Sequence, residues 1–544
     1  MIRQGRVLVV DDLEQWREEL VETLQRGGFE VDSASTATQA LEQLNRSPYH
    51  LLVLDIRMVD ADQSNTGGIE LLDELDKRGL SEATKVIILS AYGTKEQMRM
   101  AFRDHKVADF LSKDEFNNRA FLESMRQVFS KEVNINLELD VLWQQVNGPQ
   151  QVVLNLEVDG IRLKRNPTLQ SQVALELDDL LCRLFYQATS VLVRPLAQGQ
   201  SSTGVLWVQP FYTTGGGRAV VVKFGDFHKI VEEYSNFKEY VQPFIGGGRN
   251  STILDVRRTP HLGGIMYSLL GVDDDHLEDF GSFYRHADIS QIKAMLDQLF
   301  LSTCRAWYAN AGQLYPYNLT TDYQEILGFT LEKLEHALSE LLQKSVLQKS
   351  VQGKQKLFFK SLNSERAFTN PVLAMAGPPL MRPTYISTTH GDFNQHNLLV
   401  DTTGHTWLID FQATGRGHIL RDFAQLDSEI RFILLAPEEA TLEERLQMEE
   451  ALCSIERFSQ VEQLVNNFPT ENRALAKTYA TIVHLRTLAH KLVAQNPSDD
   501  ISEYYIALFY NAVNTLRFYS LPSRQREHAL LCASILADHL GLKG

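Results

Sequence analysis

The chain has 544 residues, of which 44% are hydrophobic and 22% are charged, a balance that is ordinary for a globular protein with sizeable cores. At roughly 100–200 residues per domain, this length predicts about three domains. The formal net charge of −16 argues against nucleic acid and anionic membrane surfaces as partners, because an electrostatic grip on either needs a basic face.

Cysteine usage and the lack of long apolar runs predict a cytoplasmic protein. The four cysteines are far apart and form no CxxC pair, which favours reduced, buried thiols. The apolar run at residues 7–10 is too short for a signal peptide. No stretch approaches the roughly 18 apolar residues of a membrane span, so we expect no membrane segment.

The first 130 residues alternate short apolar runs with segments of helical spacing. The apolar runs are typical of buried parallel strands and lie at 7–10, 51–54, 86–89 and, more weakly, 108–111. The segments between them, such as 14–25 and 37–44, have the period of a helix. Alternation of strand and helix at this pitch predicts an α/β doubly wound domain with a parallel sheet.

Polar residues follow these runs at the points where the strands should end. Asp11 and Asp12 close the first run, Asp55 the second, Ser90 the third and Lys113 the last. In an open parallel sheet, the carboxyl ends of the strands form the ligand crevice. Three carboxylates there would repel one another without a divalent cation, and Mg²⁺ prefers oxygen ligands. A hydroxyl and an ammonium suit phosphoryl oxygens; the alternative, unrelated strand-end caps, fits poorly with five such residues in register.

On these residues, the sequence over roughly 4–130 resembles a response-regulator receiver domain. The resemblance implies a five-stranded parallel sheet, Asp55 as phosphoacceptor, and a sensor histidine kinase or a phosphotransfer protein as partner. It leaves a homodimer open. One departure is the loop at residues 59–66, which is several residues longer than usual and lacks the usual Pro after Met58.

The same resemblance implies how the pocket works. Asp12 would hold Mg²⁺ directly and Asp11 through water, while Ser90 and Lys113 would bind the acyl phosphate. Phe110 would be the aromatic switch that reorients together with Ser90. We expect the face that carries Phe110 to contact the segment that follows the receiver.

Further along, two apolar runs flank a Gly/Ser-rich turn that includes Gly199 and Ser201. Backbone N–H groups of such a turn are suited to cover the phosphates of ATP, although any Gly-rich hairpin has this pattern. The next apolar strand ends in Lys223, comparable to the strand lysine that pairs with nucleotide phosphates in kinases. Glu233, on the following predicted helix, is the expected partner of Lys223. A solvated strand end is the alternative interpretation of Lys223.

A second cluster of polar residues begins in the motif His-Gly-Asp at residues 390–392. Asn397 comes five residues after Asp392, and Asp410 thirteen residues after Asn397, each beside an apolar run. Phosphoryl transfer from ATP uses a carboxylate that takes the proton of the acceptor hydroxyl, an amide oxygen on a metal, and a second metal-binding carboxylate. The kinase catalytic loop has the same Asp-to-Asn step and a metal-binding Asp-Phe pair.

With the downstream Arg-Asp-Phe-Ala motif at 421–424, residues 150–544 resemble the aminoglycoside phosphotransferase/choline kinase group of kinase-like folds. The resemblance implies an α+β two-lobed fold, with a small β-rich lobe and a helical lobe. His390 and Asp422 would brace the catalytic loop.

The resemblance also assigns roles around ATP and Mg²⁺, the expected cofactors. Asp392 would be the catalytic base, Asn397 and Asp410 the Mg²⁺ ligands, and Lys223 the contact to the phosphates. The sequence does not identify the hydroxyl acceptor.

The chain is therefore expected to have four segments: a receiver domain at 1–130, a linker and docking helix at 131–190, a small β-rich lobe at 191–272, and a helical lobe with the catalytic loop at 273–544. We expect a phosphorelay-controlled signalling protein whose receiver regulates an ATP-dependent phosphotransferase. One alternative is a pseudokinase-type nucleotide-binding scaffold that recruits a signalling partner without turnover. Another is a protein kinase, which the short step from Asp410 to Asp422 disfavours because it leaves little room for a long activation loop.

Overall fold

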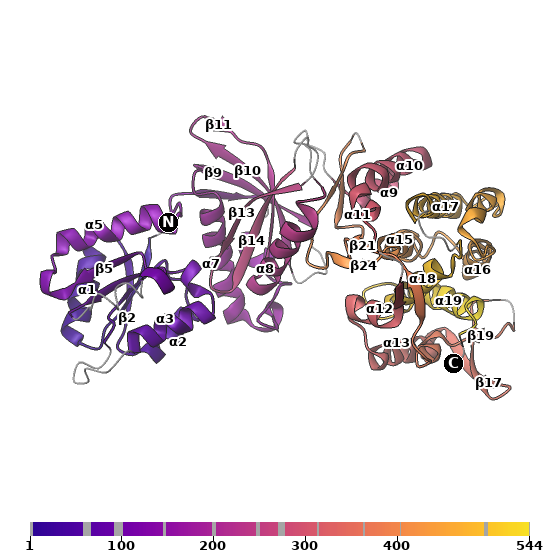
Figure 1. The fold of residues 1–544 in the computed structure, drawn as a ribbon, viewed down its shortest axis with the longest axis horizontal. Helices are drawn as coiled ribbons and strands as arrows, with labels where there is room; N and C mark the ends of the chain where they lie inside the picture. The colour runs from indigo at the N-terminus through magenta and orange to yellow at the C-terminus, as the bar shows by residue number, and fades with distance from the viewer. Residues whose placement is uncertain are drawn as a thin grey trace. The chain divides into compact units, whose positions relative to one another are not determined.

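The computed structural model describes residues 4–57, 67–91, 102–144, 148–197, 203–245, 251–269, 278–312, 315–362, 365–402, 404–493 and 499–542. Contacts divide the chain into two compact units (Figure 1). Unit 1 comprises Met1–Tyr234 and Thr252–Leu269, and unit 2 comprises Ser235–Ser251 and Leu270–Gly544.

The N-terminal part of unit 1 is a parallel sheet of five strands in the order β2-β1-β3-β4-β5. The strands are β1 (Arg6–Val10), β2 (Glu30–Ala34), β3 (Leu51–Leu54), β4 (Lys85–Ser90) and β5 (Asp109–Ser112). The helices are α1 (Glu14–Arg26), α2 (Ala37–Leu44), α3 (Gly67–Lys77) and α5 (Asn118–Val128), and short turns η1 (Leu80–Glu82) and η2 (Lys113–Glu115) flank β4 and β5.

Two apolar cores enclose this sheet, because successive side chains of a strand point to opposite faces. On β1, Val7 and Val9 join the core that includes Leu20 of α1 and Phe121 of α5. Leu8 and Val10 join the core of α2 and α3 on the other face. Helices thus cover both faces of the sheet (Figure 1), and the predicted doubly wound domain with a five-stranded parallel sheet is confirmed.

The rest of unit 1 is built on a larger, mostly antiparallel sheet in the order β13-β14-β12-β10-β9-β6, with β11 beside β10. Its strands are β6 (Asp140–Trp143), β9 (Ser190–Ala197), β10 (Gly204–Tyr212), β11 (Gly215–Gly216), β12 (Val220–Asp226), β13 (Ser251–Arg258) and β14 (Leu262–Leu269). The helices are α6 (Gly148–Val152), α7 (Pro167–Leu184) and α8 (Phe227–Asn236), with the small hairpin β7 (Glu157–Val158) and β8 (Ile161–Arg162) between α6 and α7.

Residues 131–190 are more than the expected linker. The turn η3 (Phe129–Val133) follows α5, and β6 then pairs in parallel with β9. Helix α7 buries Val173, Leu177 and Leu181 in the same core as strands β9, β10, β12 and β14. This segment is therefore an integral part of the sheet domain that follows the receiver.

Unit 2 is mainly helical. Its helices are α9 (Phe280–His286), α10 (Ile289–Gln298), α11 (Arg305–Ala309), α12 (Leu319–Leu327), α13 (Leu331–Lys344), α14 (Pro371–Ala374), α15 (Arg421–Ser428), α16 (Leu442–Leu452), α17 (Arg473–Val493), α18 (Ser502–Thr515) and α19 (Ser523–His539). Helical turns η5 (Phe237–Val241), η6 (Leu299–Thr303), η7 (Glu429–Leu434) and η8 (Phe458–Asn466) accompany them.

Small sheets complete unit 2. They are β15 (Glu278–Asp279) with β22 (Leu398–Val400) and β23 (Thr406–Leu408), β16 (Tyr315–Asn318) with β20 (Met381–Thr384), β17 (Val346–Val351) with β18 (Lys354–Phe359) and β19 (Phe368–Thr369), and β21 (Ile386–Thr389) with β24 (Gly415–His418). The hairpin of β22 and β23 lies between Asn397 and Asp410 in sequence and pairs Leu398 with Leu408.

A network of buried charges lies in the interior of the helical unit. Arg431, on η7, donates to Asp427 (Nε to Oδ1, 2.6 Å) and to Glu449 (Nη1 to Oε2, 2.5 Å). Tyr504 donates to the other oxygen of Asp427 at 2.8 Å, and His528 lies 2.8 Å from Glu449. All five side chains come from different elements, so the network joins α15, η7, α16, α18 and α19. Since buried charges need partners, the network fixes how these elements pack.

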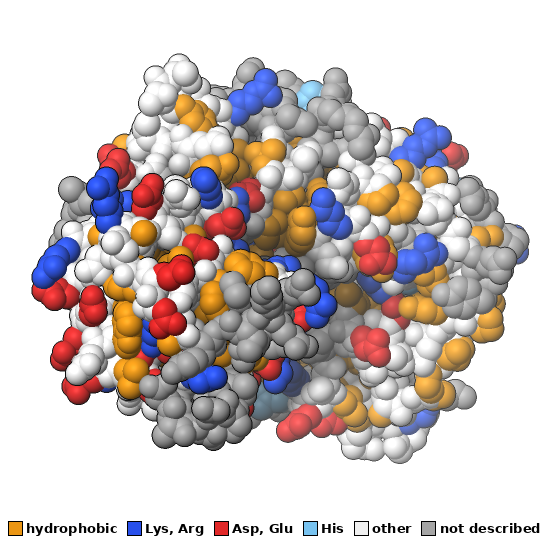
Figure 2. Space-filling view, turned by 60° about the vertical axis from the view of Figure 1, so that its left-hand side comes forward, with side chains coloured by type: hydrophobic (Ala, Val, Ile, Leu, Met, Phe, Trp, Pro, Cys, Tyr) orange, Lys and Arg blue, Asp and Glu red, His pale blue; other side chains and the backbone are white. Residues whose placement is uncertain are grey.

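Charged side chains of both signs lie on the surface. Figure 2 shows acidic and basic side chains interspersed over the face drawn, with hydrophobic side chains between them. Among the described residues, no helix combines the length and the apolar character needed to cross a membrane. All four cysteines are buried.

Replacing Arg431 with Ala is expected to destabilise the helical unit by about 3–5 kcal/mol, because it leaves the carboxylates of Asp427 and Glu449 buried without their main cation. The measurement is the free energy of unfolding from urea titrations of the full chain. The control is Arg366→Ala, which breaks the exposed pair with Glu450 and should cost less than about 1 kcal/mol. Equal costs for the two variants would contradict a structural role for the network.

Candidate functional site

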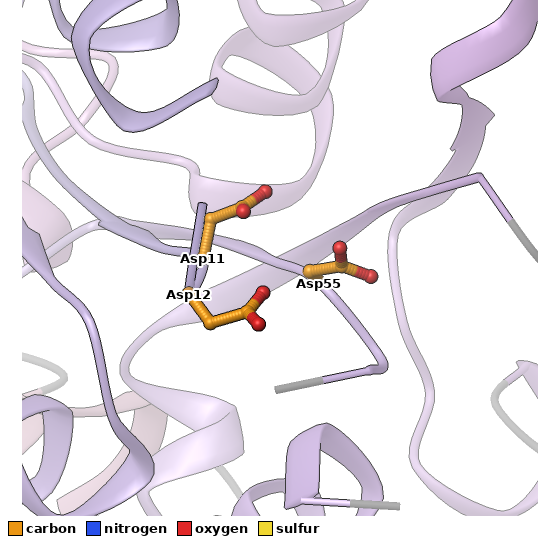
Figure 3. Close-up of side chains that lie close together, drawn as sticks. All are labelled: Asp11, Asp12 and Asp55. Atoms are coloured by element: carbon orange, nitrogen blue, oxygen red, sulfur yellow. The ribbon is translucent and has the colours of Figure 1, made fainter. Parts of the chain in front are cut away.

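Three carboxylates converge at the carboxyl ends of β1 and β3 (Figure 3). Asp11 and Asp12 directly follow β1, and Asp55 directly follows β3. One oxygen of each side chain lies within 4.8 Å of the other two. The structure thus brings together the three residues that the sequence predicts as Mg²⁺ ligands, and an all-oxygen donor set fits that ion.

Lys113 places its ammonium between two of these carboxylates. Its Nζ lies 2.6 Å from Asp11 Oδ2 and 2.5 Å from Asp55 Oδ2. Burial raises the pKa of Asp11, which the hydrogen bond from Lys113 only partly offsets. Burial alone would lower the pKa of Lys113, but its hydrogen bonds to Asp11 and Asp55 raise it. One ammonium beside three carboxylates leaves an excess of negative charge, which a divalent cation would balance.

The remaining predicted pocket residues occupy neighbouring positions. Ser90 is buried at the end of β4, where it pairs with Ser112, the residue before Lys113. Phe110 lies on β5 and packs partly buried against the core of α2 and α3. Their roles toward a phosphoryl group stay predictions.

Two residues of α1 that the sequence reasoning missed support the pocket. Arg17 donates from Nη1 to the backbone carbonyls of Asp11 and Asp12, both at 2.8 Å. The ring of Trp16 lies 5.2 Å from the ammonium of Lys113. Arg17 therefore fixes the turn that carries two carboxylates. The sequence signal for it was weak, because an Arg in the first turns of a helix usually faces solvent.

In the sheet domain, Lys223 and Glu233 form a buried ion pair. Lys223 Nζ lies 2.6 Å from Glu233 Oε2, and each side chain is only 1% exposed. Tyr267, on β14, donates its hydroxyl to Glu233 Oε1 at 2.6 Å, a contact that the sequence did not predict. Gly199 and Ser201 lie outside the described residues. A strand lysine held by a helix glutamate is the arrangement that positions nucleotide phosphates in kinases.

In unit 2, the Asp392 carboxylate is held from two sides. Asn397 donates from Nδ2 to Asp392 Oδ2 at 3.1 Å and to the Asp392 carbonyl at 2.9 Å. Gln425, on α15, donates to Asp392 Oδ1 at 3.0 Å and accepts the amide N–H of Phe393 at 2.8 Å. Gln425 was not singled out from the sequence, because only the fold brings α15 beside the loop.

The first turn of α15 also fixes the start of this loop. Asp422 accepts the amide N–H groups of His390 (2.8 Å) and Gly391 (3.1 Å), and Tyr308 donates to it at 2.9 Å. Gly391 has a φ of +81°, and a Cβ there would lie 2.1 Å from the carbonyl oxygen of Ala413. His390 lies against the Ile409 carbonyl (Nε2 to O, 3.1 Å). His390 and Asp422 thus hold the backbone at the start of this loop.

Asp410, two residues after β23, has a strained backbone conformation. Its φ is +70°, the left-handed region that non-glycine residues rarely adopt. Such strain persists only where the surroundings enforce it, and it is concentrated at functional sites. Here Asn236 donates to the carbonyls of Phe411 and Gln412, at 3.3 Å and 2.6 Å, and Phe237 packs against Phe411.

Three further ionisable side chains, Glu429, His396 and Asp279, lie in or beside the loop. Desolvation and the nearby charge of Asp392 raise the pKa of Glu429, on η7, to about 7. A hydrogen bond to Asp279 raises the pKa of the half-exposed His396. Burial alone would raise the pKa of Asp279, but the hydrogen bond from His396 lowers it to about 2. The loop therefore lies among titratable side chains rather than in apolar surroundings.

Comparison with known proteins agrees with the N-terminal fold. Residues 7–126 match the response regulator receiver domain family. Two curated relatives match this part: response regulator RR06 of Streptococcus pneumoniae, 32% identical over 96 residues (18% of this chain, 41% of that protein), and transcriptional activator protein PfeR of Pseudomonas aeruginosa, 32% identical over 112 residues (21% and 34%). The N-terminal part is thus a receiver domain, as predicted.

A second family match covers most of the remaining chain. Residues 188–356 and 360–517 match the family described as ternary complex associated domain 9, and together they cover more than half of the sequence. The chain belongs to this family. The expected likeness to the aminoglycoside phosphotransferase/choline kinase group stays a prediction.

The chain spans about two fifths of the length of RR06 and one third of PfeR. Among solved structures, a response regulator receiver domain protein from Methanospirillum hungatei is 25% identical, covers 24% of this chain and 97% of its own, and has a TM-score of 0.22. A sensor protein from Polaromonas is 22% identical, covers 24% and 99%, and also has a TM-score of 0.22.

The Asp279–His396 pair predicts a pH dependence for the loop that carries Asp392. Because its pKa is raised, the contribution of His396 to stability is present below about 6.5, the usual value, and is lost as pH rises through the folded value. We expect the ring protons of His396 to titrate in NMR with a midpoint above about 6.5.

In Asp279→Asn, this midpoint should fall, because the hydrogen-bonding carboxylate is gone. Glu278→Gln is the matched control, since the neighbouring Glu278 pairs with His286 instead. A His396 midpoint that does not respond to Asp279→Asn would contradict the pairing.

Proposed function

We propose that this protein is a phosphorelay-controlled regulator whose receiver accepts a phosphoryl group on Asp55 and controls ATP-dependent phosphoryl transfer to a hydroxyl acceptor. The observation that carries the enzymatic part is the catalytic loop. Asp392 is held by Asn397 and Gln425 on a loop braced by Asp422, with a strained Asp410 after the hairpin. The receiver part rests on the acid pocket and on the family match of residues 7–126.

In the receiver, an oxygen of Asp55 forms the bond to phosphorus as the phosphorus–nitrogen bond of a phosphohistidine donor breaks. Lys113, already 2.5 Å from Asp55, balances the charge that the phosphoryl group brings. The Ser90 hydroxyl, at the end of the next strand, would bind a phosphoryl oxygen. Asp11, Asp12 and Asp55 would hold Mg²⁺, which neutralises charge on the transferred group.

In the second reaction, Asp392 takes the proton of the acceptor hydroxyl. The acceptor oxygen bonds to the γ-phosphorus, and the bond to the leaving ADP breaks. Asn397 and Asp410 would hold Mg²⁺, and Lys223 would contact the phosphates of ATP. Glu233 and Tyr267 keep the Lys223 ammonium in one position. Because Glu429 has a pKa of about 7, it is mostly neutral below that pH and adds little negative charge beside Asp392.

The receiver half is tested by phosphorylation with acetyl phosphate and Mg²⁺, measured as the mass of the intact protein. The wild type should gain one phosphoryl group, and Asp55→Asn should gain none. Chelating Mg²⁺ should abolish the reaction, because three carboxylates repel the incoming anion without it. Asp114→Asn, an exposed residue beside Lys113, is the control and should react normally. Labelling that persists in Asp55→Asn would disprove the assignment.

The catalytic half is tested by ATP consumption with a broad set of hydroxyl acceptors. Asp392→Asn should abolish turnover while ATP still binds, because it removes the base and leaves Lys223 in place. Gln425→Ala should lower kcat by about 10²-fold with little change in KM, since a mispositioned base costs about that much. Gln447→Ala, exposed on α16, is the control. ATP binding without turnover for any acceptor in the wild type would instead favour the scaffold that recruits a partner.

A further inference from the structure

Helix α7 is joined to the receiver by buried polar contacts within unit 1. His50, the residue before β3, donates from Nε2 to Asp179 Oδ1 of α7 at 2.6 Å. Arg183, one turn later on α7, lies 2.7 Å from Asp179 Oδ2 and donates to the Ala83 carbonyl of the receiver at 3.0 Å. All three side chains are at most 9% exposed. We name this group, His50, Asp179 and Arg183, the α7 joint.

The α7 joint has one defined proton arrangement. The amide N–H of Arg6 donates to His50 Nδ1 at 2.9 Å, so Nδ1 is an acceptor and the proton of the neutral ring lies on Nε2. Burial alone would raise the pKa of Asp179, but the charge of Arg183 and the contact with His50 hold it low. Asp179 is therefore an anion with both oxygens bound, which fixes the helix against the receiver.

Further contacts extend the joint along the same edge of the receiver. Arg258, at the end of β13, donates to the Gly79 carbonyl at 2.6 Å, with its guanidinium over the ring of Phe227. Gln172 of α7 donates to the Arg46 carbonyl at 2.7 Å. The side chain of Ile135 packs against the core of the receiver and against that of the sheet domain. These contacts connect the two domains through both polar and apolar atoms.

The joint lies at the opposite end of the receiver sheet from the acid pocket. His50 and Asp55 flank the four residues of β3, while Ala83 lies two residues before β4 and Ser90 is its last residue. The contact made by α7 therefore differs from the expected one through the face that carries Phe110. Two central strands connect the joint directly with the pocket.

From α7, contacts continue to the Lys223–Glu233 pair. Leu180 of α7 packs so closely on Gly264 of β14 that a Cβ there would lie 2.8 Å from its Cδ2. In the register of β12 and β14, Gly264 pairs with Phe224 and the next residue, Ile265, pairs with Lys223. Tyr267, two residues further along β14, donates to Glu233. Packed side chains and rigid strands thus link the receiver to this ion pair.

We infer that the α7 joint transmits the phosphorylation state of the receiver to the Lys223–Glu233 pair, by making the receiver and the sheet domain one cooperative unit. Coupling between two sites requires an element whose state both of them bias, and α7 contacts residues just before β3 and β4 in the receiver and strand β14 in the sheet domain. This inference rests on the proposed function, since it assigns a regulatory input to the proposed nucleotide contact.

The test is hydrogen exchange of the full chain, measured by mass spectrometry with and without beryllofluoride and Mg²⁺, which mimic the acyl phosphate. In the wild type, the ligand should slow exchange in β3 and β4 and also in β12 and β14, the latter by at least about fivefold. Asp179→Asn removes the charge that holds Arg183 and should confine the protection to the receiver. Leu175→Ala, 56% exposed on the same helix, should behave as the wild type.

A second variant guards against misfolding of Asp179→Asn. Arg183→Lys keeps the positive charge beside Asp179 but shortens the reach toward the Ala83 carbonyl, and it should reduce the response of β14 in the same direction. Protection of β3 without any response of β14 in the wild type would overturn the inference. So would an unchanged β14 response in both joint variants. The readout needs no ATP turnover, so an inactive Asp392 loop leaves the result interpretable.

Discussion

The helical unit depends on the charges that it buries. Asp427 and Glu449 are anions in the interior, and Arg431, between them, can satisfy both only while α15, η7 and α16 keep their positions. Arg445 joins the network through its contact with His528, and Arg486 donates to the Leu452 carbonyl. Asp422 and Gln425, which hold the Asp392 loop, lie on α15, the helix that ends next to Asp427. Removing one partner from the network would therefore also disturb the loop that carries Asp392.

Both candidate sites use a lysine that is held in advance of any ligand. Lys113 lies between Asp11 and Asp55, and Lys223 lies against Glu233, at distances of 2.5 to 2.6 Å. In the proposed function, an ammonium fixed in this way would need no reorganisation when a phosphoryl group arrives, and such preorganisation is the main source of electrostatic catalysis. The surroundings differ, however: Lys113 pairs with two carboxylates of a cluster of three, whereas the partner of Lys223 also accepts a hydrogen bond from the hydroxyl of Tyr267.

Features with a local sequence signal were predicted, whereas features that depend on contacts across the fold were not. Buried parallel strands such as β3 were evident because every residue is apolar, and the carboxylates at their ends followed from the topology of such sheets. The edge strand β2 was not recognised, because its five residues are mostly polar and exposed. Arg17, Gln425 and the α7 joint were missed for another reason. Each acts through a contact across the fold, and no periodicity or motif reports which carbonyl or carboxylate a surface-like polar side chain will meet.

The placement of the α7 joint has a consequence for how the receiver can work. In the proposed function, a phosphodonor would reach Asp55 at the carboxyl ends of the strands, while His50 and Ala83 meet α7 at the amino ends. Phosphorylation therefore need not break the contacts of the joint, and the signal can pass through β3 and β4 with the domains still docked. Because His50 donates as a neutral ring to an anion that Arg183 also holds, the joint adds no net charge to the receiver core. A connection of this kind favours small shifts within one folded unit over release of a tethered domain.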